Sequence, residues 1–526
     1  MQLPTDTAPA ERAAVRPVAT ASATASAAAL AGTVAGAAAL AVSELLAGLV
    51  AGAPSLVVEV GAFVIGRQPP GAKQLVVGIF GTNDKLALNV LVALIAVGLA
   101  ALLGIVARRR QGLARFGYAA IGLAAFLVSL PDPLVDPLLA LLTCLVAVAV
   151  AILTLQRLLA IATPAAARAE MPDWSRRRFL GTSLGVGAAA IGGGVVGRLL
   201  LDRQRLETPP GVPALPPVAA PTLPPGTSLE VAGLTPIVVP NDRFYRIDTQ
   251  LLTPRLDART WKLRIHGLVD REVTLSYADL LAMPMQQQYV TIACVSNEVG
   301  GDLVGNALWG GVRLQRILDL AGVRRGASQV VGRAFDGWTC GFPTLWLTDE
   351  GKEALLAVRM NGAPLPAAHG FPARLIVPGL YGYVSATKWI TEIELTTLEA
   401  FDAYWVPLGW AKYGPIKTQS RIDTPRGGVQ LPIGRVAVAG VAWAPERGIA
   451  GVEVQVDDSP WAAARLSTPI GRATWVQWLY PWNAVAGRHA LRVRATDGTG
   501  VVQTAAVQPP APSGATGYHT ISVSVG

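Results

Sequence analysis

The chain has 526 residues, a mean hydropathy of +0.42 and only 15% charged residues. This length exceeds one hydrophobic core, and the composition excludes an ordinary fully soluble protein. The formal net charge of +9 forms no long basic run or helical stripe, so we expect no nucleic acid partner.

Apolar residues are concentrated before residue 202. Runs long enough to cross a bilayer cover 24–50, 86–107, 138–161 and 179–201, with a shorter run at 114–130. We therefore predict five spans. Residues 55–80 carry charges and prolines within an apolar pattern, which favours a re-entrant or interfacial piece over a sixth span.

Basic clusters predict the orientation of these spans. Arg108–Arg110 with Arg115 mark one loop as cytoplasmic, and Arg176–Arg178 mark another two spans later. The chain beyond residue 202 is then expected outside the cytoplasm, so the protein is predicted to be a multi-pass protein of the cell membrane. The lipid bilayer is its first expected partner.

Residues 175–180 read SRRRFL, which resembles a twin-arginine export signal and implies the twin-arginine export machinery as a partner. The alternative is that three arginines simply flank a span. A Pro-rich segment within 202–234 follows and is expected to be extended, holding the next part off the bilayer.

The remaining chain changes to a mixed α and β pattern. Strands are expected at 241–251 and 260–269, helices at 276–284 and 312–323, and a strand running into a glycine turn at 374–383. Beyond residue 421, short alternating strands separated by turn signals predict a small β-sandwich of immunoglobulin type.

These patterns predict the following domains. They are a membrane region with about four spans (1–178), an anchor span preceded by the twin-arginine-like motif (179–201), a Pro-rich linker (202–234), an α+β domain (235–415), an immunoglobulin-like β-sandwich (416–510) and a C-terminal tail (511–526).

Cys294 is presented at the end of a β-like run and at the start of a Gly/Asn-rich loop. A thiolate on such a loop suits a metal, whereas a lone cysteine is more commonly a small buried hydrophobe. Pairing of Cys294 with Cys340 is a third possibility. Three cysteines, no CxxCH and no histidine within the apolar runs predict neither haem nor an iron–sulfur cluster.

A second dense group lies between His369 and Ile390. His369, Arg374 and Lys388 lie among glycines that permit close backbone approach, which suits binding of a phosphate and a large polar heterocycle. The alternative is a set of surface cations beside a core strand. His266 and Asp336 are weaker candidates, for which we expect structural roles.

Several segments together resemble the sulfite oxidase family of molybdopterin enzymes. They are FYRIDTQL, CVSNEVGGDLVGNALWGGVRL, DGWTCGFP, MNGAPLPAAHGFPARLIVPGLYGYVSATKWI and YWVPLGWAKYGPIKTQSRIDTP. The resemblance covers about residues 235–510. It implies a mononuclear molybdenum held by one molybdopterin per chain and by a single protein thiolate, which is Cys294.

The resemblance also assigns other residues by position. Arg246 matches an arginine that contacts an anionic substrate near the metal. The cofactor-binding positions are Tyr245, Arg246, Asn297, His369, Arg374, Ser385, Thr387 and Lys388. Arg421 and Arg426 are further candidate pocket cations.

Two departures from the family pattern bear on the reaction. Glu298 and Val299 replace two arginines of the cysteine loop, and a catalytic tyrosine falls on Trp338, which has no phenolic proton to donate. An anion such as sulfite therefore gains less from this pocket.

We expect a membrane-anchored molybdenum oxidoreductase that transfers an oxygen atom and two electrons to or from a small-molecule substrate. It requires a separate electron-transfer partner, a quinone or a cytochrome. The alternatives are a sulfoxide or N-oxide reductase and a non-catalytic surface binding protein that retains the fold.

Overall fold

The computed structural model describes residues 19–69, 83–162, 173–206, 212–347 and 353–526, with Ala72, Val76, Ile79 and Phe80 between the first two ranges. The chain forms two compact units, which are treated separately. The first comprises Met1–Arg67 and Val76–Gln204, and the second comprises Gln68–Leu75 and Arg205–Gly526.

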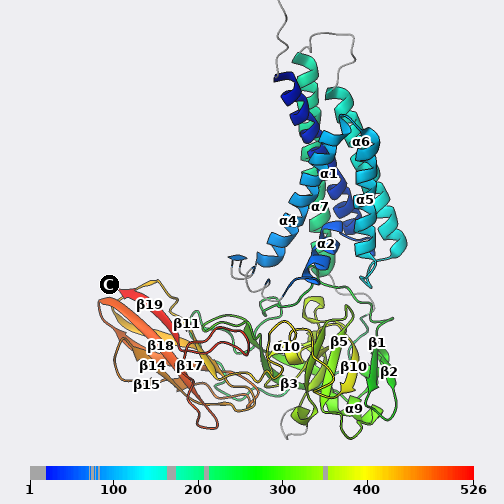
Figure 1. The fold of residues 1–526 in the computed structure, drawn as a ribbon. Coiled ribbons are helices and arrows are strands. Elements are labelled where there is room, and N and C mark those ends of the chain that lie inside the picture. Colours follow the sequence, from blue (N-terminus) through cyan, green and yellow to red (C-terminus); the bar gives the residue numbers. More distant parts are fainter. Residues whose placement is uncertain are drawn as a thin grey trace, which may run out of the picture. The chain divides into compact units, whose positions relative to one another are not determined.

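The first unit is a helical bundle (Figure 1). Its helices are α1 (Ala19–Leu49), α2 (Leu56–Ile65), α4 (Asp84–Ala107), α5 (Gln111–Ser129), α6 (Pro137–Ala162) and α7 (Asp173–Leu206). Within the described residues, five of them are long and apolar enough to cross a membrane, in agreement with the predicted number. The exception, α2, has only 10 residues, which is too short for a span.

Small residues allow the helices of this bundle to approach closely. A side chain at Gly32 of α1 would collide with the Ala100 backbone of α4, and one at Gly104 would collide with the Ala28 backbone. Gly48 and Gly197 permit a similar approach of α1 and α7. Such contacts stabilise helix pairs where burial of apolar surface between helices gains little, as in a bilayer.

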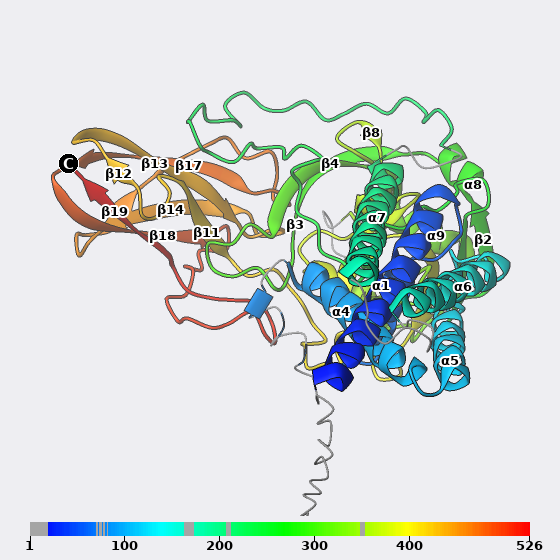
Figure 2. The same ribbon diagram turned by 90° about the horizontal axis from the view of Figure 1, so that it is seen from above.

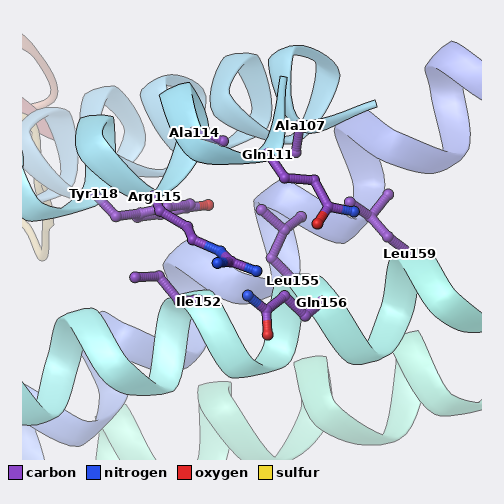
Figure 3. A pocket seen from close by; sticks show the side chains of 9 residues that line it. All are labelled: Ala107, Gln111, Ala114, Arg115, Tyr118, Ile152, Leu155, Gln156 and Leu159. Atoms are coloured by element: carbon purple, nitrogen blue, oxygen red, sulfur yellow. The ribbon is translucent and has the colours of Figure 1, made fainter. Parts of the chain in front are cut away.

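A small cleft lies between α5 and α6, with polar side chains from both helices directed into it (Figure 3). It is lined by Ala107, Gln111, Ala114, Arg115, Tyr118, Ile152, Leu155, Gln156 and Leu159.

Two β-sheets form the first part of the second unit. One has the order β2 (Val273–Ser276), β1 (Lys262–Gly267), β10 (Ile390–Thr396), β5 (Gln329–Ala334) and β6 (Thr339–Pro343), with only β1 and β10 parallel. The other has β3 (Gln286–Ala293), β4 (Val304–Arg313), β7 (Leu355–Met360) and β8 (Ala363–Pro364), and β9 (Arg374–Ile376) also pairs with β7.

Two short helices accompany these sheets, as the sequence predicts. α8 (Tyr277–Ala282) begins at a capping box in which Ser276 and Asp279 satisfy each other's backbone N–H groups. α9 (Leu314–Ala321) buries Leu314, Ile317, Leu318 and Ala321 on one face and ends at Gly322, whose positive φ suits glycine.

The predicted strand at 241–251 is wrong. The structure has turns and irregular backbone there, because the polar side chains of this stretch bind other groups and form no ladder. Asn241, for example, donates to the Met360 carbonyl, and Arg246 pairs with Asp248. In residues 241–251, the alternation of polar and apolar residues therefore reflects side chains that share one environment, and it does not indicate a paired strand.

The chain ends in two packed sheets. The first contains β11 (Gln419–Thr424), β13 (Gly434–Trp443), β17 (Val476–Ala484) and β16 (Arg465–Leu466). The second contains β12 (Gln430–Leu431), β19 (His519–Val525), β18 (Gly487–Asp497), β14 (Ile449–Val456) and β15 (Ala462–Ala463). The immunoglobulin-type assignment of this sandwich stays a prediction.

Residues 511–526 are not a free tail, contrary to the sequence-based expectation. His519–Val525 forms β19, which pairs along seven residues with β18 and also meets β12. Its side chains alternate in burial, with Val523 and Val525 in the sandwich core. The boundary of the sandwich therefore lies beyond residue 510.

Trp475 joins the sandwich to the preceding sheets. Its indole N–H donates to the Ile237 carbonyl at 2.9 Å, and its backbone N–H donates to the Thr291 hydroxyl of β3 at 2.8 Å. Trp443 and Trp475 belong to the same hydrophobic core as β3 and β4. The sandwich is thus packed directly against the strand that leads to Cys294.

The Pro-rich segment follows an extended path along the second unit (Figure 2). It is docked there and is not a free spacer, because Gln287 donates to the Val218 carbonyl at 2.7 Å and Arg359 donates to the Pro216 carbonyl. Val212 and Leu215 pack on the core of the two sheets. Residues 207–211 lie outside the described residues.

Candidate functional site

Cys294 follows directly after β3, and its loop is closed by hydrogen bonds. Its backbone N–H donates to the Leu303 carbonyl at 2.9 Å, while its carbonyl accepts from the Asn297 N–H at 3.1 Å. The Asn297 side-chain oxygen accepts from the Leu303 N–H at 2.8 Å. The thiol is buried and forms no disulfide, and these hydrogen bonds fix the backbone that carries it.

The far end of the same loop is anchored by the sandwich. The Arg421 guanidinium of β11 donates to the Gly301 carbonyl at 2.7 Å and pairs with Asp423 at 2.6 Å. Gly300, at a φ of +79°, lies against the His519 ring, where a side chain would collide. Arg421 is therefore a buried anchor of the cysteine loop, and Arg426 is exposed, so neither is a pocket cation.

His369 is buried and uncharged at neutral pH. Burial, followed by the nearby cations Arg374, Lys388 and Arg246, lowers the pKa of its imidazole to about 4. Its Nε2 lies 2.9 Å from the Asn241 carbonyl oxygen, which can only accept, so Nε2 carries the proton. Sequence alone left both protonation states open.

Arg374 is a buried cation at the start of β9. Its guanidinium donates to the His369 carbonyl at 3.1 Å and more weakly to two other carbonyls, and it lies 5.0 Å from the centre of the Trp309 ring. Burial lowers its pKa to about 10. Within the described part of the chain, no carboxylate pairs with it.

Lys388 is also buried, and burial lowers the pKa of its ammonium to about 8 even though Asp248 raises it. Its Nζ donates to Asp248 at 2.6 Å and to the Ala368 carbonyl at 3.1 Å. Arg374 and Lys388 thus hold two buried positive charges near each other. Asp248 supplies one negative charge, so the pair keeps a buried positive charge that is costly, and a phosphate-bearing cofactor would balance it.

Asp248, which sequence reasoning missed, joins Lys388 to Arg246. The Arg246 Nε lies 3.1 Å from the same Asp248 oxygen that Lys388 contacts. The Asp248 side chain is 3% exposed, whereas that of Arg246 is 39% exposed. In the sequence, only the spacing of two residues between Arg246 and Asp248 could have indicated this ion pair, and such a spacing is too common to identify a pair by itself.

Trp338 lies in the turn between β5 and β6, beside Asp336. Its backbone N–H donates to Asp336 at 3.1 Å, and the same carboxylate accepts from the Gln250 amide. The indole Nε1 is buried and has no hydrogen-bond partner within the described residues. Asp336 therefore lies in the electrostatic surroundings of Asp248, and its expected structural role stays a prediction.

Ser385 and Thr387 have hydroxyl partners inside the protein. Ser385, in α10 (Gly382–Ser385), donates to the Tyr381 carbonyl at 3.0 Å, and the Thr387 hydroxyl lies 2.9 Å from the Cys340 sulfur. Cys340 is free, so it does not pair with Cys294.

Two tyrosine hydroxyls lie in the electrostatic surroundings of Cys294. Burial, with a smaller contribution from the Cys294 thiolate, raises the pKa of Tyr245 well above its usual range and that of Tyr381 to about 12. Tyr245 was predicted from the sequence. Tyr381 was not, because it lies on the turn before α10 and only the fold brings it near the cysteine.

The structure thus groups His369, Arg374, Lys388 and Arg246, and Tyr245 lies in the electrostatic surroundings of both Arg374 and Cys294. Within the part of the chain that the structure describes, no three His, Cys, Asp or Glu side chains are grouped to hold a metal ion. A metal at this site would have Cys294 as its protein ligand and would need its other ligands from a cofactor.

Comparison with known proteins agrees with this arrangement. Residues 250–405 match the model of the oxidoreductase molybdopterin binding domain. The uncharacterized oxidoreductase YuiH of Bacillus subtilis is 38% identical over 159 residues, which are 30% of this chain and 76% of that protein. Mouse mitochondrial sulfite oxidase is 29% identical over 272 residues, 44% of this chain and 49% of that one.

Among solved structures, the sulfane dehydrogenase SoxCD of Paracoccus pantotrophus is similar with a TM-score of 0.48 and 21% identity, over 61% of this chain and 88% of that one. The chain spans about half the length of the rodent sulfite oxidases it matches. On the match to the domain model and the extent of the match to YuiH, this chain belongs to the sulfite oxidase family of molybdopterin oxidoreductases.

Proposed function

We propose that the protein is a molybdenum-dependent oxidoreductase that transfers an oxygen atom between water and a small-molecule substrate. The observation that carries this proposal is a buried Cys294 thiol that forms no disulfide and lies on a hydrogen-bonded loop. It acts electrostatically on Tyr245, which also lies in the electrostatic surroundings of the buried cation Arg374. A thiolate suits a soft metal centre, and the buried guanidinium of Arg374, which pairs with no carboxylate in the described part of the chain, suits the phosphate of an organic cofactor.

The residues present fit one molybdopterin. Cys294 would bind the metal, Arg374 and Lys388 would bind the phosphate, and the His369 imidazole is available at the same place as a neutral group. The bound cofactor would supply the two-electron chemistry of oxygen-atom transfer. The hydroxyls of Ser385 and Thr387 are engaged within the protein, so contacts from that segment would come from its backbone.

Around the reacting position, Arg246 and Trp338 would orient the substrate. Arg246 exposes part of its guanidinium, and the Trp338 indole N–H is a buried donor without a protein partner in the described part. In the oxidising direction, water supplies the oxygen atom, and two protons and two electrons are released. The electrons pass to a separate partner, a quinone or a cytochrome.

A reductase that acts on a sulfoxide or an N-oxide is the second candidate. It is favoured by Glu298 and Val299 on the cysteine loop and by the pairing of Arg246 with Asp248, all of which lower the positive charge available to an anion. In that direction, two electrons and two protons are consumed, the substrate loses one oxygen atom and water forms.

We further propose that the first unit anchors the protein in the cell membrane and that the second unit faces outward after export through the twin-arginine route. The support is five helices of sufficient length and hydropathy, the basic clusters between them and the SRRRFL motif at the start of α7. Protease should cut within residues 202–234 in intact cells as readily as in lysed cells; cleavage only after lysis would contradict the orientation.

The decisive experiment is a metal and pterin analysis of the purified full-length protein. We expect about one molybdenum and one pterin per chain, and Cys294→Ser should abolish turnover and alter the electron paramagnetic resonance signal of Mo(V). Cys144→Ala, which removes a free buried thiol from α6, is the matched control. Absence of stoichiometric molybdenum and pterin would favour the non-catalytic binding protein.

The direction of the reaction is tested with artificial electron acceptors and donors. Reduced dyes with sulfoxides or N-oxides test the reductase, and oxidised dyes with sulfite test the oxidase. Rapid turnover of sulfite would overturn the argument from the reduced positive charge of the pocket.

A further inference from the structure

The arginine expected to bind substrate has its own counter-ion. Arg246 Nε lies 3.1 Å from an oxygen of Asp248, and the same oxygen accepts from Lys388 at 2.6 Å. The carboxylate is 3% exposed, so solvent screens it little. Asp248 therefore opposes the field of Arg246 at the point where a substrate would approach.

An anion that binds Arg246 must approach this buried carboxylate. The attraction of the guanidinium is then offset by repulsion from Asp248, and the like charge is within a few ångströms of the guanidinium. A second carboxyl, Asp336, is hydrogen-bonded to Gln250 and lies in the electrostatic surroundings of Asp248. Glu298 adds a further acidic residue on the cysteine loop.

The donors at this place suit an uncharged oxygen. The Trp338 Nε1–H is buried without a protein partner in the described part of the chain, and the Arg246 side chain is 39% exposed. An indole N–H and a guanidinium that is paired with a carboxylate donate hydrogen bonds to an S=O or N–O oxygen without requiring that the substrate carry net charge. Leaving such a buried donor unpaired would be costly.

We propose that Asp248 is a specificity-determining residue: by offsetting part of the positive charge of Arg246, it weakens the binding of anions such as sulfite and shifts the selection of the site toward uncharged S- or N-oxides or their uncharged reduced forms. This inference rests on the proposed oxidoreductase function, and it names the substrate class of the same site.

The test measures anion binding separately from turnover. Sulfate, an unreactive analogue of sulfite, is titrated calorimetrically into the full-length protein and into Asp248→Asn, which keeps the shape of the side chain and removes its charge. We expect the sulfate affinity to rise by about tenfold or more in the variant, equivalent to about 1.4 kcal/mol. In dye-linked turnover, the ratio of kcat/KM for sulfite to that for dimethyl sulfoxide should rise in the same direction.

A double-mutant cycle assigns the effect to Arg246. In the wild-type background, Arg246→Gln should change sulfate affinity by less than about threefold, because Asp248 already opposes the attraction of the guanidinium. In the Asp248→Asn background, Arg246→Gln should remove the gain. Asp257→Asn, which breaks the more exposed pair with Arg259, is the matched control and should change neither quantity.

The results separate the two proposals. Unchanged sulfate affinity in a folded Asp248→Asn protein, or a large loss of sulfate affinity in Arg246→Gln alone, would overturn the role of Asp248 even if the enzyme turns over sulfoxides. Absence of turnover with every substrate in molybdenum-loaded protein would overturn the oxidoreductase proposal, while the sulfate titrations would still decide the role of Asp248. Because Arg246→Gln leaves Asp248 intact, its result holds even if Asp248→Asn fails to fold.

Discussion

Replacing Arg374 with methionine should have opposite effects on the stability of the protein without and with its cofactor. In the cofactor-free protein, burial lowers the pKa of the guanidinium from 12.5 to about 10. This shift corresponds to about 3 kcal/mol against the charged side chain. Loss of the 3.1 Å hydrogen bond to the His369 carbonyl costs the variant about 1 kcal/mol of stability. The net expectation is that Arg374→Met stabilises the cofactor-free protein by about 2 kcal/mol.

With the cofactor bound, the sign reverses, because Arg374 would donate charge-assisted hydrogen bonds to the phosphate. Each such bond contributes about 1.5–3 kcal/mol, so we expect cofactor affinity to fall by about tenfold to a hundredfold. Since a ligand that binds only the folded state stabilises it, Arg374→Met should lower the unfolding temperature of the loaded protein.

The assay is thermal unfolding of the full-length protein in detergent, purified from cells that make the pterin and from cells that do not. Arg359→Met is a suitable control, because Arg359 is also buried with a lowered pKa but donates to the Pro216 carbonyl of the extended segment. Its effect should have the same sign in both preparations. If Arg374→Met destabilised both preparations equally, the residue would be a structural arginine and the reasoning would fail.

Two further predictions follow from the surroundings of the site. Burial lowers the pKa of Lys388 from 10.5 to about 8, so between these pH values the unfolded chain binds more protons than the folded chain. The stability of the cofactor-free protein should therefore rise with pH across this range. Chemical denaturation should show that rise, and a rise of the same size in Lys388→Met would contradict the assignment to Lys388. Arg421→Met should cost about 3–5 kcal/mol of stability, because it leaves Asp423 buried without its cation. Adding Asp423→Asn should restore much of the stability but not kcat, since the Gly301 carbonyl still lacks its anchor. Full recovery of kcat at equal molybdenum content would show that Arg421 does not position the cysteine loop.

Much of the architecture was predictable from local patterns. Apolar runs longer than a bilayer is thick indicate long helices whatever surrounds them, and all five apolar runs correspond to helices of sufficient length. The sandwich strands β13, β14, β17 and β18 were predicted from alternation and turn residues. The stretch 241–251 misled the same reasoning, because polar alternation also arises when side chains face a common charged cluster.

Some residues of the candidate site were predictable from the sequence, and others were not. Cys294, His369, Arg374 and Lys388 were predicted from the sequence because each lies in a recognisable local segment. The roles of Arg421, His519 and Tyr381 were not found, since these residues lie 87 to 225 positions from Cys294 and meet its surroundings only through the packing of the sandwich and of the turn before α10.

The sequence by itself determined the division into an apolar helical unit and an α+β unit with a sandwich, and it identified the thiol that would hold the metal. The physical reason is that hydrophobic periodicity and turn chemistry act over a few residues. Only the tertiary structure decided the charge of the pocket. Whether Arg246 is free or paired depends on the buried Asp248 carboxylate and on Lys388, which lies 140 residues further along the chain. Burial and distance set that balance, and neither can be deduced from a string of residue types.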